Sequence, residues 1–302
     1  MKKFLIRIID CLFKLKNVLI NTFYSVFDFF YSKIHKAPQV ASVEETIDMI
    51  LKGNSIARFG DGEIKLVAGR DISFQKATPL VVHKLREVLS SDESGLMIGV
   101  ADIFGNRERY SENSTKYWNN HLKKYRHIWY KYMIKDKQYY NASFTRQYIS
   151  LKDKNSSKEI FNKIRKIWDK KDIVIIEGSK SRLGVGNDLL SNARSIRRII
   201  GPSSQAFEKY DALLNSAKQM PPDTLFLLSM GPCATALAYD LHKLGYRAID
   251  IGHVDIEYEW FTMKTEKKVP IKNKIVHEAR NDIEDDSFYD PTYESQIISI
   301  NL

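Results

Sequence analysis

Cysteine is scarce in this sequence, and the two that occur, Cys11 and Cys233, lie far apart. Neither a disulfide framework nor a cysteine zinc site is therefore supported, and the cysteine usage fits a reducing cytoplasm. Long apolar runs are also lacking, because charged residues interrupt every N-terminal window of about twenty residues that a membrane span would need. No small-residue cleavage site follows the N-terminal apolar segment, so a signal peptide is not predicted.

Motifs for nucleic-acid binding are missing too, although the formal net charge of +10 would suit a polyanion. We find no zinc-finger spacing and no run of mixed aromatic and basic residues of the kind that binds RNA. Half of the excess charge lies in residues 1–36, where seven basic residues face only Asp10 and Asp28. The basic residues are Lys2, Lys3, Arg7, Lys14, Lys16, Lys33 and Lys36. We therefore expect no nucleic-acid partner and look to this segment for the role of the charge.

Residues 1–36 combine this charge with apolar residues at close to helical spacing, which predicts one or two amphipathic helices. Such a helix suits peripheral contact with the inner face of an anionic membrane. It equally suits docking on the protein's own core or on a partner, and the pattern leaves both open. Ser42 and Glu45 then form a capping box, so we place an extension and linker at 1–41 and the globular domain at 42–302.

The remainder of the chain shows apolar strand patterns that alternate with helical ones. From Lys171 onward, strands are predicted at 172–178, 196–200, 224–230 and 247–251, with helices at 188–195, 203–219 and 236–244 between them. Strands and helices that alternate with short links specify an α/β fold with a mostly parallel, Rossmann-like sheet and helices on both faces. Ligands of such sheets bind at the carboxyl ends of the strands.

The first candidate site is the run from Arg58 to Glu63, which reads Arg-Phe-Gly-Asp-Gly-Glu. Asp61 and Glu63 are predicted to present oxygen ligands from a tight turn to Mn²⁺ or Mg²⁺, which both prefer such ligands. Gly60 and Gly62 would let the backbone approach a bound phosphate, and Arg58 would meet its charge. An ordinary turn with a solvated Glu63 remains the alternative.

Two glycine-containing loops follow predicted strands and are the next candidates. The loop at 177–188 places Gly184 and Gly186 ahead of the predicted helix at 188–195, with Lys180 and Arg182 beside them, which suits a diphosphate. It is a poor dinucleotide fingerprint, because Leu189 stands where a third glycine belongs. Gly231 offers a similar cradle after the strand at 224–230, or a simple strand-to-helix turn.

The last candidate follows the predicted strand at 247–251, where His253, Asp255, Glu257 and Glu259 occur at every second position. If this segment stays extended, all four side chains point to one face. Such a row suits a bound cation or a bound sugar, and His253 is then a candidate metal ligand. A solvated edge of the sheet is the alternative. One carboxylate could be a general base, with His253 as a second candidate. A hydrolase pair of His253 with Ser229 or Cys233 is disfavoured because neither signature sequence is present.

Four blocks together resemble the GT-D-type glycosyltransferases of Gram-positive bacteria. They are 58–63, 181–189, 231–240 and 250–260, and the resemblance extends from about residue 42 to the end. It implies a Rossmann-like enzyme that uses a UDP-sugar and a divalent metal, with the family's D-x-E motif at Asp61 and Glu63. It also implies active-site roles for Asp255, Glu257 and Glu278.

The predicted function is therefore metal-dependent transfer of a hexose, glucose or galactose, from a UDP-sugar to a glycan or glycoprotein acceptor. We place it in the cytoplasm, at the inner membrane face if residues 1–36 bind there. A nicotinamide-dependent oxidoreductase on the same type of sheet is one alternative, and a membrane-bound scaffold without enzymatic activity is the other.

Overall fold

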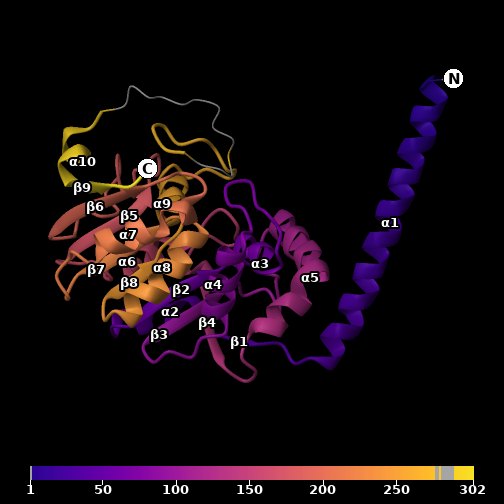
Figure 1. Cartoon of the computed structure of the whole chain (residues 1–302), viewed down its shortest axis with the longest axis horizontal. Coiled ribbons are helices and arrows are strands. Elements are labelled where there is room, and N and C mark those ends of the chain that lie inside the picture. The colour runs from indigo at the N-terminus through magenta and orange to yellow at the C-terminus, as the bar shows by residue number, and fades with distance from the viewer. Residues whose placement is uncertain (1, 276–278, 280–288) are drawn as a thin grey trace.

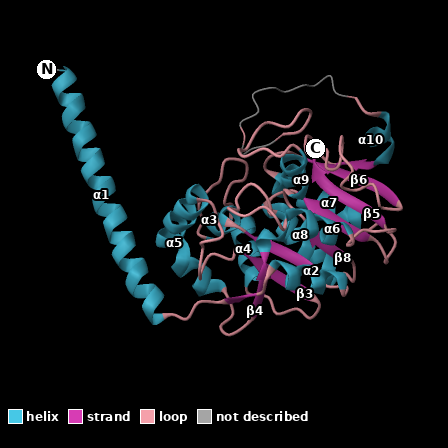
Figure 2. Cartoon of the chain, turned by 180° about the vertical axis from the view of Figure 1, so that it is seen from behind, coloured by secondary structure: helices cyan, strands magenta, loops and turns pink. Residues whose placement is uncertain are grey.

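The computed structural model describes residues 2–275, 279 and 289–302, with residues 2–14 and 17 described only by their backbone. Within this part of the chain the strands are β1 (Gln39–Val40), β2 (Ser55–Phe59), β3 (Leu96–Val100), β4 (Gln138–Asn141), β5 (Asp172–Gly178), β6 (Ser195–Gly201), β7 (Leu225–Ser229), β8 (Arg247–Asp250) and β9 (Ile297–Ile300). They form one sheet in the order β1-β4-β3-β2-β8-β7-β5-β6-β9, and all neighbours are parallel (Figure 2).

Helices cover both faces of this sheet. The α-helices are α1 (Lys2–Ile34), α2 (Val43–Leu51), α3 (Asp61–Val67), α4 (Pro79–Leu89), α5 (Glu112–Tyr132), α6 (Ser157–Arg165), α7 (Tyr210–Ala217), α8 (Pro232–Lys243), α9 (Val254–Thr262) and α10 (Pro291–Gln296), with short 3-10 helices η1 (Ala142–Thr145) and η2 (Ala206–Lys209). One core contains side chains of α3, α4, α5, α7 and α8, and the other contains side chains of α2, α6 and α9. The predicted Rossmann-like parallel sheet is confirmed.

The strand β5 shows why the sequence gives a sheet buried on both faces. Its side chains alternate between the two cores: Ile173 and Ile175 pack with α2, α6 and α9, and Val174 and Ile176 pack with the helices of the other face. All four are fully buried. A continuous β-branched run is typical of such strands, because alternate residues then bury apolar surface on both faces.

Local signals also fixed several helix boundaries. The capping box at the start of α2 is present, since Ser42 accepts from the Glu45 amide and the Glu45 carboxylate accepts from the Ser42 amide at 2.8 Å. The predicted helix at 236–244 is the second part of α8, which ends just before Gly245. The segment predicted as a linker contributes β1, whose Gln39 is paired with Gln138 of β4.

The two halves of the chain meet in the middle of the sheet. Strands β1 to β4 lie on one side and β5 to β9 on the other, and β2 pairs with β8 through Ile56 and Ile249. The carboxyl ends of β2 and β8 therefore lie side by side, next to those of β7 and β5. Crevices above such strand ends are where parallel sheets bind ligands.

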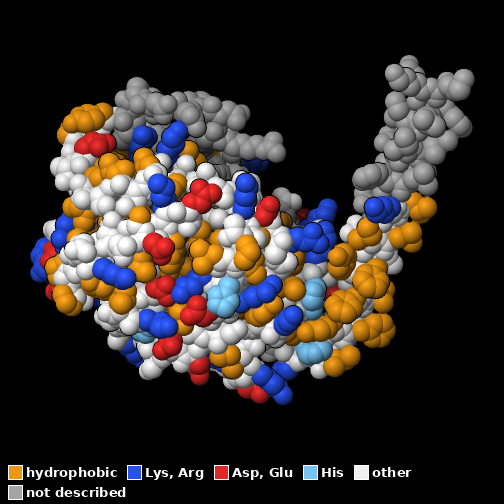
Figure 3. All heavy atoms as spheres, viewed as in Figure 1, with side chains coloured by type: hydrophobic (Ala, Val, Ile, Leu, Met, Phe, Trp, Pro, Cys, Tyr) orange, Lys and Arg blue, Asp and Glu red, His pale blue; other side chains and the backbone are white. Residues whose placement is uncertain are grey.

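Helix α1 projects from the body of the protein and packs against α5 only near its own C-terminal end (Figure 1). Arg126 Nε lies 2.6 Å from Asp28 Oδ1, and the rings of Tyr31 and Tyr130 are 6.0 Å apart. Hydrophobic side chains gather along the rest of its described surface (Figure 3). No helix among the described residues has the length and apolar character to cross a membrane.

Candidate active site

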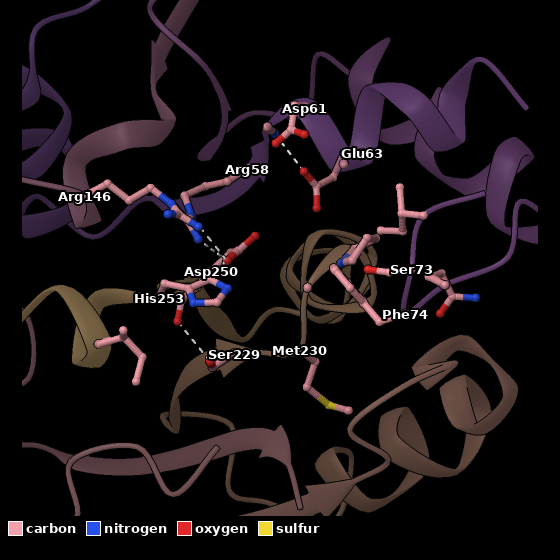
Figure 4. A pocket seen from close by; sticks show the side chains of 18 of the residues that line it. Arg58, Asp61, Glu63, Ser73, Phe74, Arg146, Ser229, Met230, Asp250 and His253 are labelled. Carbon is pink, nitrogen blue, oxygen red and sulfur yellow. Dashed lines mark hydrogen bonds and ion pairs between the residues drawn. The ribbon is translucent and has the colours of Figure 1, made fainter. Parts of the chain in front are cut away.

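A cavity of about 810 Å³ opens at the carboxyl ends of the central strands. Its walls come from both halves of the chain: the start of α3, the first turns of α5, and the segments that follow β5, β7 and β8. Of the residues predicted from sequence, Arg58, Gly60, Asp61, Gly62, Glu63, Gly231, His253 and Asp255 line this cavity. Segments far apart in sequence thus converge on one site (Figure 4).

Asp61 and Glu63 lie in the first turn of α3, and the prediction of a tight turn at this position is wrong. Gly60 is the N-cap residue, and its amide donates to Glu63 Oε2 at 2.8 Å. Asp61 accepts hydrogen bonds from Lys65 Nζ at 2.6 Å and from the hydroxyl of Tyr117 on α5. A helix begins here because carboxylates are favoured in a first turn, where they bind unpaired amides and face the positive end of the helix dipole.

The surroundings of Asp61 and Glu63 shift the pKa values of these two carboxyl groups in opposite directions. Enclosure by protein raises the pKa of Glu63 to about 7, and the nearby charges of Asp250 and Asp61 add to this effect. Burial alone would raise the pKa of Asp61 as well, but the hydrogen bonds from Lys65 and Tyr117 outweigh it and the pKa is lowered. Glu63 is therefore poorly solvated and lies near two further carboxylates, and a bound divalent cation would favour its charged form.

Arg58 forms a buried ion pair with Asp250 at the end of β8. Its Nη2 lies 3.0 Å from Asp250 Oδ1, and its Nη1 donates to the carbonyl of Ala142 and the hydroxyl of Thr145. The guanidinium thus joins β2, β8 and η1 at the wall of the cavity. Gly252 makes this possible, because its φ is +44° and a Cβ there would lie 1.7 Å from Arg58 Nη2.

Asp250 was not among the residues selected from sequence. The sequence did offer a signal for it, because Asp250 is a carboxylate at the end of an apolar strand. Burial raises the pKa of this carboxyl group, and a buried carboxylate that is costly to keep charged often has a function. Figure 4 shows Asp61, Glu63 and Asp250 around the same part of the cavity.

The donor chemistry of Asp61 and Glu63 fits Mn²⁺ or Mg²⁺. Within residues 2–275, 279 and 289–302, no three His, Cys, Asp or Glu side chains gather as a preformed metal site, so His253 does not complete one with this pair. Mg²⁺ usually takes only one or two carboxylates, together with waters and substrate phosphates. The pair is therefore suited to a cation that binds together with a diphosphate.

The predicted extended segment at 253–259 is wrong, because α9 starts at Val254 with His253 as its N-cap residue. Val254, Tyr258 and Phe261 recur at helical spacing and pack in the core below, which favours the helix. The alternating acidic residues consequently point in different directions. Asp255 and Glu259, one turn apart, contact Lys274 Nζ at 2.7 and 2.9 Å.

Asp255 and Glu257 occupy different surroundings. Asp255 lines the cavity and also accepts from the Gly184 amide at 3.0 Å and from Asn187 Nδ2 at 2.7 Å. Glu257 is fully buried away from the cavity, where it accepts from the amides of Tyr148 and Ile149, both at 3.1 Å. The third predicted carboxylate, Glu278, lies outside the described residues.

The predicted helix at 188–195 is also wrong, since this segment consists of turns that lead into β6. Asn187 accepts from the Leu189 amide, and Trp168 Nε1 donates to the Leu189 carbonyl at 3.1 Å. These bonds tie the backbone to other elements and prevent a helical ladder. Gly184 and Gly186 are consequently not at a helix N-terminus and do not line the cavity.

Arg182 lies in the same loop and also stands apart from the cavity wall. It donates to the Asn273 carbonyl at 2.7 Å, which ties the loop to the segment that carries Lys274. Lys180, the other basic residue expected beside a diphosphate, does line the cavity, as does Ser181, which was not selected from sequence.

Gly231 forms the predicted turn from strand to helix, as the N-cap residue of α8 with a φ of +53°. A Cβ at this position would lie 2.9 Å from the ring of Phe74, which borders the cavity. Glycine is therefore required both by the backbone conformation and by the space available.

The hydrolase alternative has no support in this geometry. Cys233 is fully buried, and burial raises the pKa of its thiol, which opposes nucleophilic chemistry. Ser229 Oγ donates to the Gly252 carbonyl at 2.9 Å.

Comparison with known proteins identifies similar sequences and structures. A model of the glycosyltransferase GT-D fold matches residues 56–279. The chain is 41% identical over 265 residues to a probable glycosyl transferase Gly from Streptococcus gordonii, covering 86% of this chain and 38% of that protein. It is 36% identical over 263 residues to glycosyltransferase GlyD from Streptococcus pneumoniae, covering 86% and 32%. The chain thus spans about a third of the length of these curated relatives.

Solved structures agree with this result. A glycosyltransferase (DUF1792) from Streptococcus sanguinis superposes with a TM-score of 0.84 at 40% identity, covering 88% of this chain and all of that one. A second structure, described as a domain of unknown function 1792 with a distinct glycosyltransferase fold, gives a TM-score of 0.86 at 34% identity, covering 90% and 99%.

Proposed function

This chain belongs to the glycosyltransferase GT-D family, and we propose that it transfers a hexose, glucose or galactose, from a UDP-sugar to a glycan or glycoprotein acceptor with Mn²⁺ or Mg²⁺. The observation that carries the proposal is the placement of Asp61 and Glu63 at the wall of the cavity above the strand ends. The proposal of UDP as the carrier and of a hexose as the transferred sugar rests on the sequence resemblance to the family.

Asp61 and Glu63 would hold the cation, which supplies positive charge to the diphosphate that leaves the sugar. Lys180, two residues after β5, and Lys268, in the segment that follows α9, both line the cavity and would add positive charge to the same group. Arg58 fixes Asp250 rather than the diphosphate, so its role is to position β8 against β2. Glu257 likewise supports the backbone at Tyr148 and Ile149.

The acceptor hydroxyl must lose a proton during transfer. Asp255 lines the cavity, whereas Glu257 does not, and we therefore propose Asp255 as the base, with the adjacent His253 as the second candidate. Both residues lie at the start of α9, so one short segment carries the proposed proton acceptors.

Calorimetric titration of the purified chain with UDP tests this proposal. We expect binding in the micromolar range with Mn²⁺ and a loss of at least about 10-fold in affinity with EDTA, because the cation offsets the diphosphate charge. A parallel titration with NADH should be silent. A folded protein that binds NADH, or that binds no UDP in either condition, would contradict the proposal.

For α1 we propose peripheral attachment to an anionic membrane at the cytoplasmic face. Its described outer surface exposes Leu19, Phe23, Val26, Phe30 and Ile34 at spacings of three and four residues, between 52% and 77% accessible. The stripe lies on a different face of α1 from Asp28 and Tyr31, which contact α5, and the segment carries half of the chain's excess positive charge. Aromatic and basic residues on one helix are typical of interfacial binding.

Vesicle sedimentation tests this attachment. The full chain is expected to bind phosphatidylglycerol-containing vesicles, and Phe23→Ser/Phe30→Ser should weaken binding about 10- to 100-fold, because two exposed rings no longer enter the interface. A matched control, Leu80→Ser/Leu302→Ser, removes equally exposed apolar groups from the body and should bind as the parent does. Self-association through α1 without vesicle binding would refute the assignment.

A further inference from the structure

The cavity has two ends of different chemistry. One end lies above β5 and β7, where Lys180, Ser181, Ser203 and Gly231 offer basic, hydroxyl and backbone groups. The other end lies against the first turns of α5, which contribute aromatic and neutral polar side chains, and Lys65 of α3 donates to the Tyr117 hydroxyl there at 3.3 Å. Asp61 lies next to this second end, because it accepts a hydrogen bond from Tyr117, and Figure 4 shows Glu63 and Asp250 facing the same part of the cavity. A donor diphosphate matches the first end, which leaves the second for another ligand.

The α5 end is built from residues one helical turn apart. Asn113 and Tyr117 form one pair and Ser114 and Trp118 form another, so both pairs lie on the same face of the helix and line the cavity. The rings of Tyr117 and Trp118 meet edge to face with centroids 5.4 Å apart. Two rings beside an amide and a hydroxyl can cover the C–H face of a pyranose and bind its hydroxyls.

This face of α5 differs from the rest of the helix. His121, one turn further along, and Trp129, about two turns beyond it, are buried and hydrogen-bonded to each other at 3.1 Å, as expected of core residues. Tyr117, in contrast, is 46% accessible. Its hydroxyl is bonded to Asp61, so the ring is held next to the carboxylate pair. A sugar on this platform would bring its hydroxyls to the reaction centre.

We propose that the first two turns of α5 form the acceptor subsite, which binds a pyranose ring of the acceptor glycan against Tyr117 and Trp118, with Asn113 bonded to a ring hydroxyl. This assignment rests on the proposed glycosyltransferase function. It separates the substrates: the donor binds above β5 and β7, and the acceptor binds against α5.

Tryptophan fluorescence reads out this subsite directly. Trp129, Trp168 and Trp260 are at most 1% accessible, whereas Trp118 is half-buried at the cavity wall. Methyl pyranosides of glucose, galactose and N-acetylglucosamine are titrated into the chain saturated with UDP and Mn²⁺. At least one should shift the emission saturably with a Kd of about 1–50 mM, and Trp118→Phe should abolish the shift.

Asn113→Ala gives the quantitative test. Loss of one hydrogen bond should weaken binding of the same pyranoside about 3- to 10-fold while calorimetric UDP affinity stays unchanged. Asn120→Ala, on the exposed face of the same helix and away from the cavity wall, is the matched control. Normal UDP binding with no pyranoside response, or an equal response in Asn113→Ala, overturns the subsite alone. Failure to bind UDP overturns the proposed function and the subsite with it.

Discussion

Glu63→Gln is expected to lower the rate of sugar transfer about 100- to 1,000-fold and to weaken Mn²⁺-dependent binding of UDP to a similar degree. Glutamine has nearly the shape of glutamate, but it carries no charge to hold a cation against the diphosphate, a contribution worth several kcal/mol. The side chain lies in the first turn of α3 and is partly accessible from the cavity, so the change leaves the core intact. Calorimetry with Mn²⁺ and UDP, together with a steady-state transfer assay, measures both effects.

The chain contains a matched control for this substitution. Glu45 occupies the same capping-box position in α2 as Glu63 does in α3, and each accepts from an N-cap amide at 2.8 Å. Glu45 is exposed and does not line the cavity. Glu45→Gln should therefore reproduce any effect on the helix start without the loss of activity. If both variants lose activity equally, or if Glu63→Gln keeps its affinity for Mn²⁺ and UDP, Glu63 is no more than a capping residue.

The parts of the fold that sequence predicted well are those in which local and tertiary preferences agree. The strand at 172–178 is a short β-branched run, which favours a strand buried on both faces, and it forms β5 as expected. The capping box at Ser42 and the glycine after α8 are local signals that involve only a few neighbouring residues. Both helix boundaries could therefore be predicted without knowledge of the rest of the chain.

The errors occurred where distant contacts decide the conformation. At 253–259 the acidic residues alternate as in a strand, but Val254 and Tyr258 gain more by packing into the core as a helix. At 188–195 a helical pattern exists, yet Asn187 and Trp168 bind the backbone of Leu189 and hold it in turns. Neither the core contacts of Val254 and Tyr258 nor the bond from Trp168, 21 residues before Leu189, can be located from the local sequence.

The candidate site shows the same division. The D-x-E motif is a local signal and was found, although its place in a helix was not. One partner of Asp61, Lys65, is local, but the other, Tyr117 of α5, is 56 residues away in sequence, and the carboxylate partner of Arg58 on β8 is 192 residues away. Which strand ends become neighbours depends on the order of the sheet, and that order is a property of the whole chain.

A second large effect is expected at the buried pair of Glu177 and Arg198, where Arg198→Met should lower the free energy of unfolding by about 3–5 kcal/mol. Arg198 Nη1 lies 2.6 Å from Glu177 Oε1, with the two side chains 3% and 0% accessible. Glu177 also accepts from the Leu183 amide at 2.8 Å, so the pair supports the loop between β5 and β6. Methionine fills similar volume but leaves the carboxylate without its cation. Urea unfolding followed by circular dichroism measures the change.

The pH dependence identifies the cause of that loss. Burial already raises the pKa of Glu177 in the folded protein, although Arg198 opposes the effect, so removal of Arg198 raises that pKa further. A carboxyl whose folded pKa exceeds its unfolded value of about 4.3 binds a proton more readily when folded, and stability then falls as pH rises through that interval. The deficit of Arg198→Met should therefore be smaller at pH 5 than at pH 8.

Two control variants separate the charge effect from packing. The double variant Glu177→Gln/Arg198→Met should recover most of the lost stability. Arg197→Met, which changes a half-buried neighbour of Arg198, should lower the free energy of unfolding by less than about 1 kcal/mol. A deficit that is equal at both pH values would show that lost packing, and not the unpaired carboxylate, is responsible.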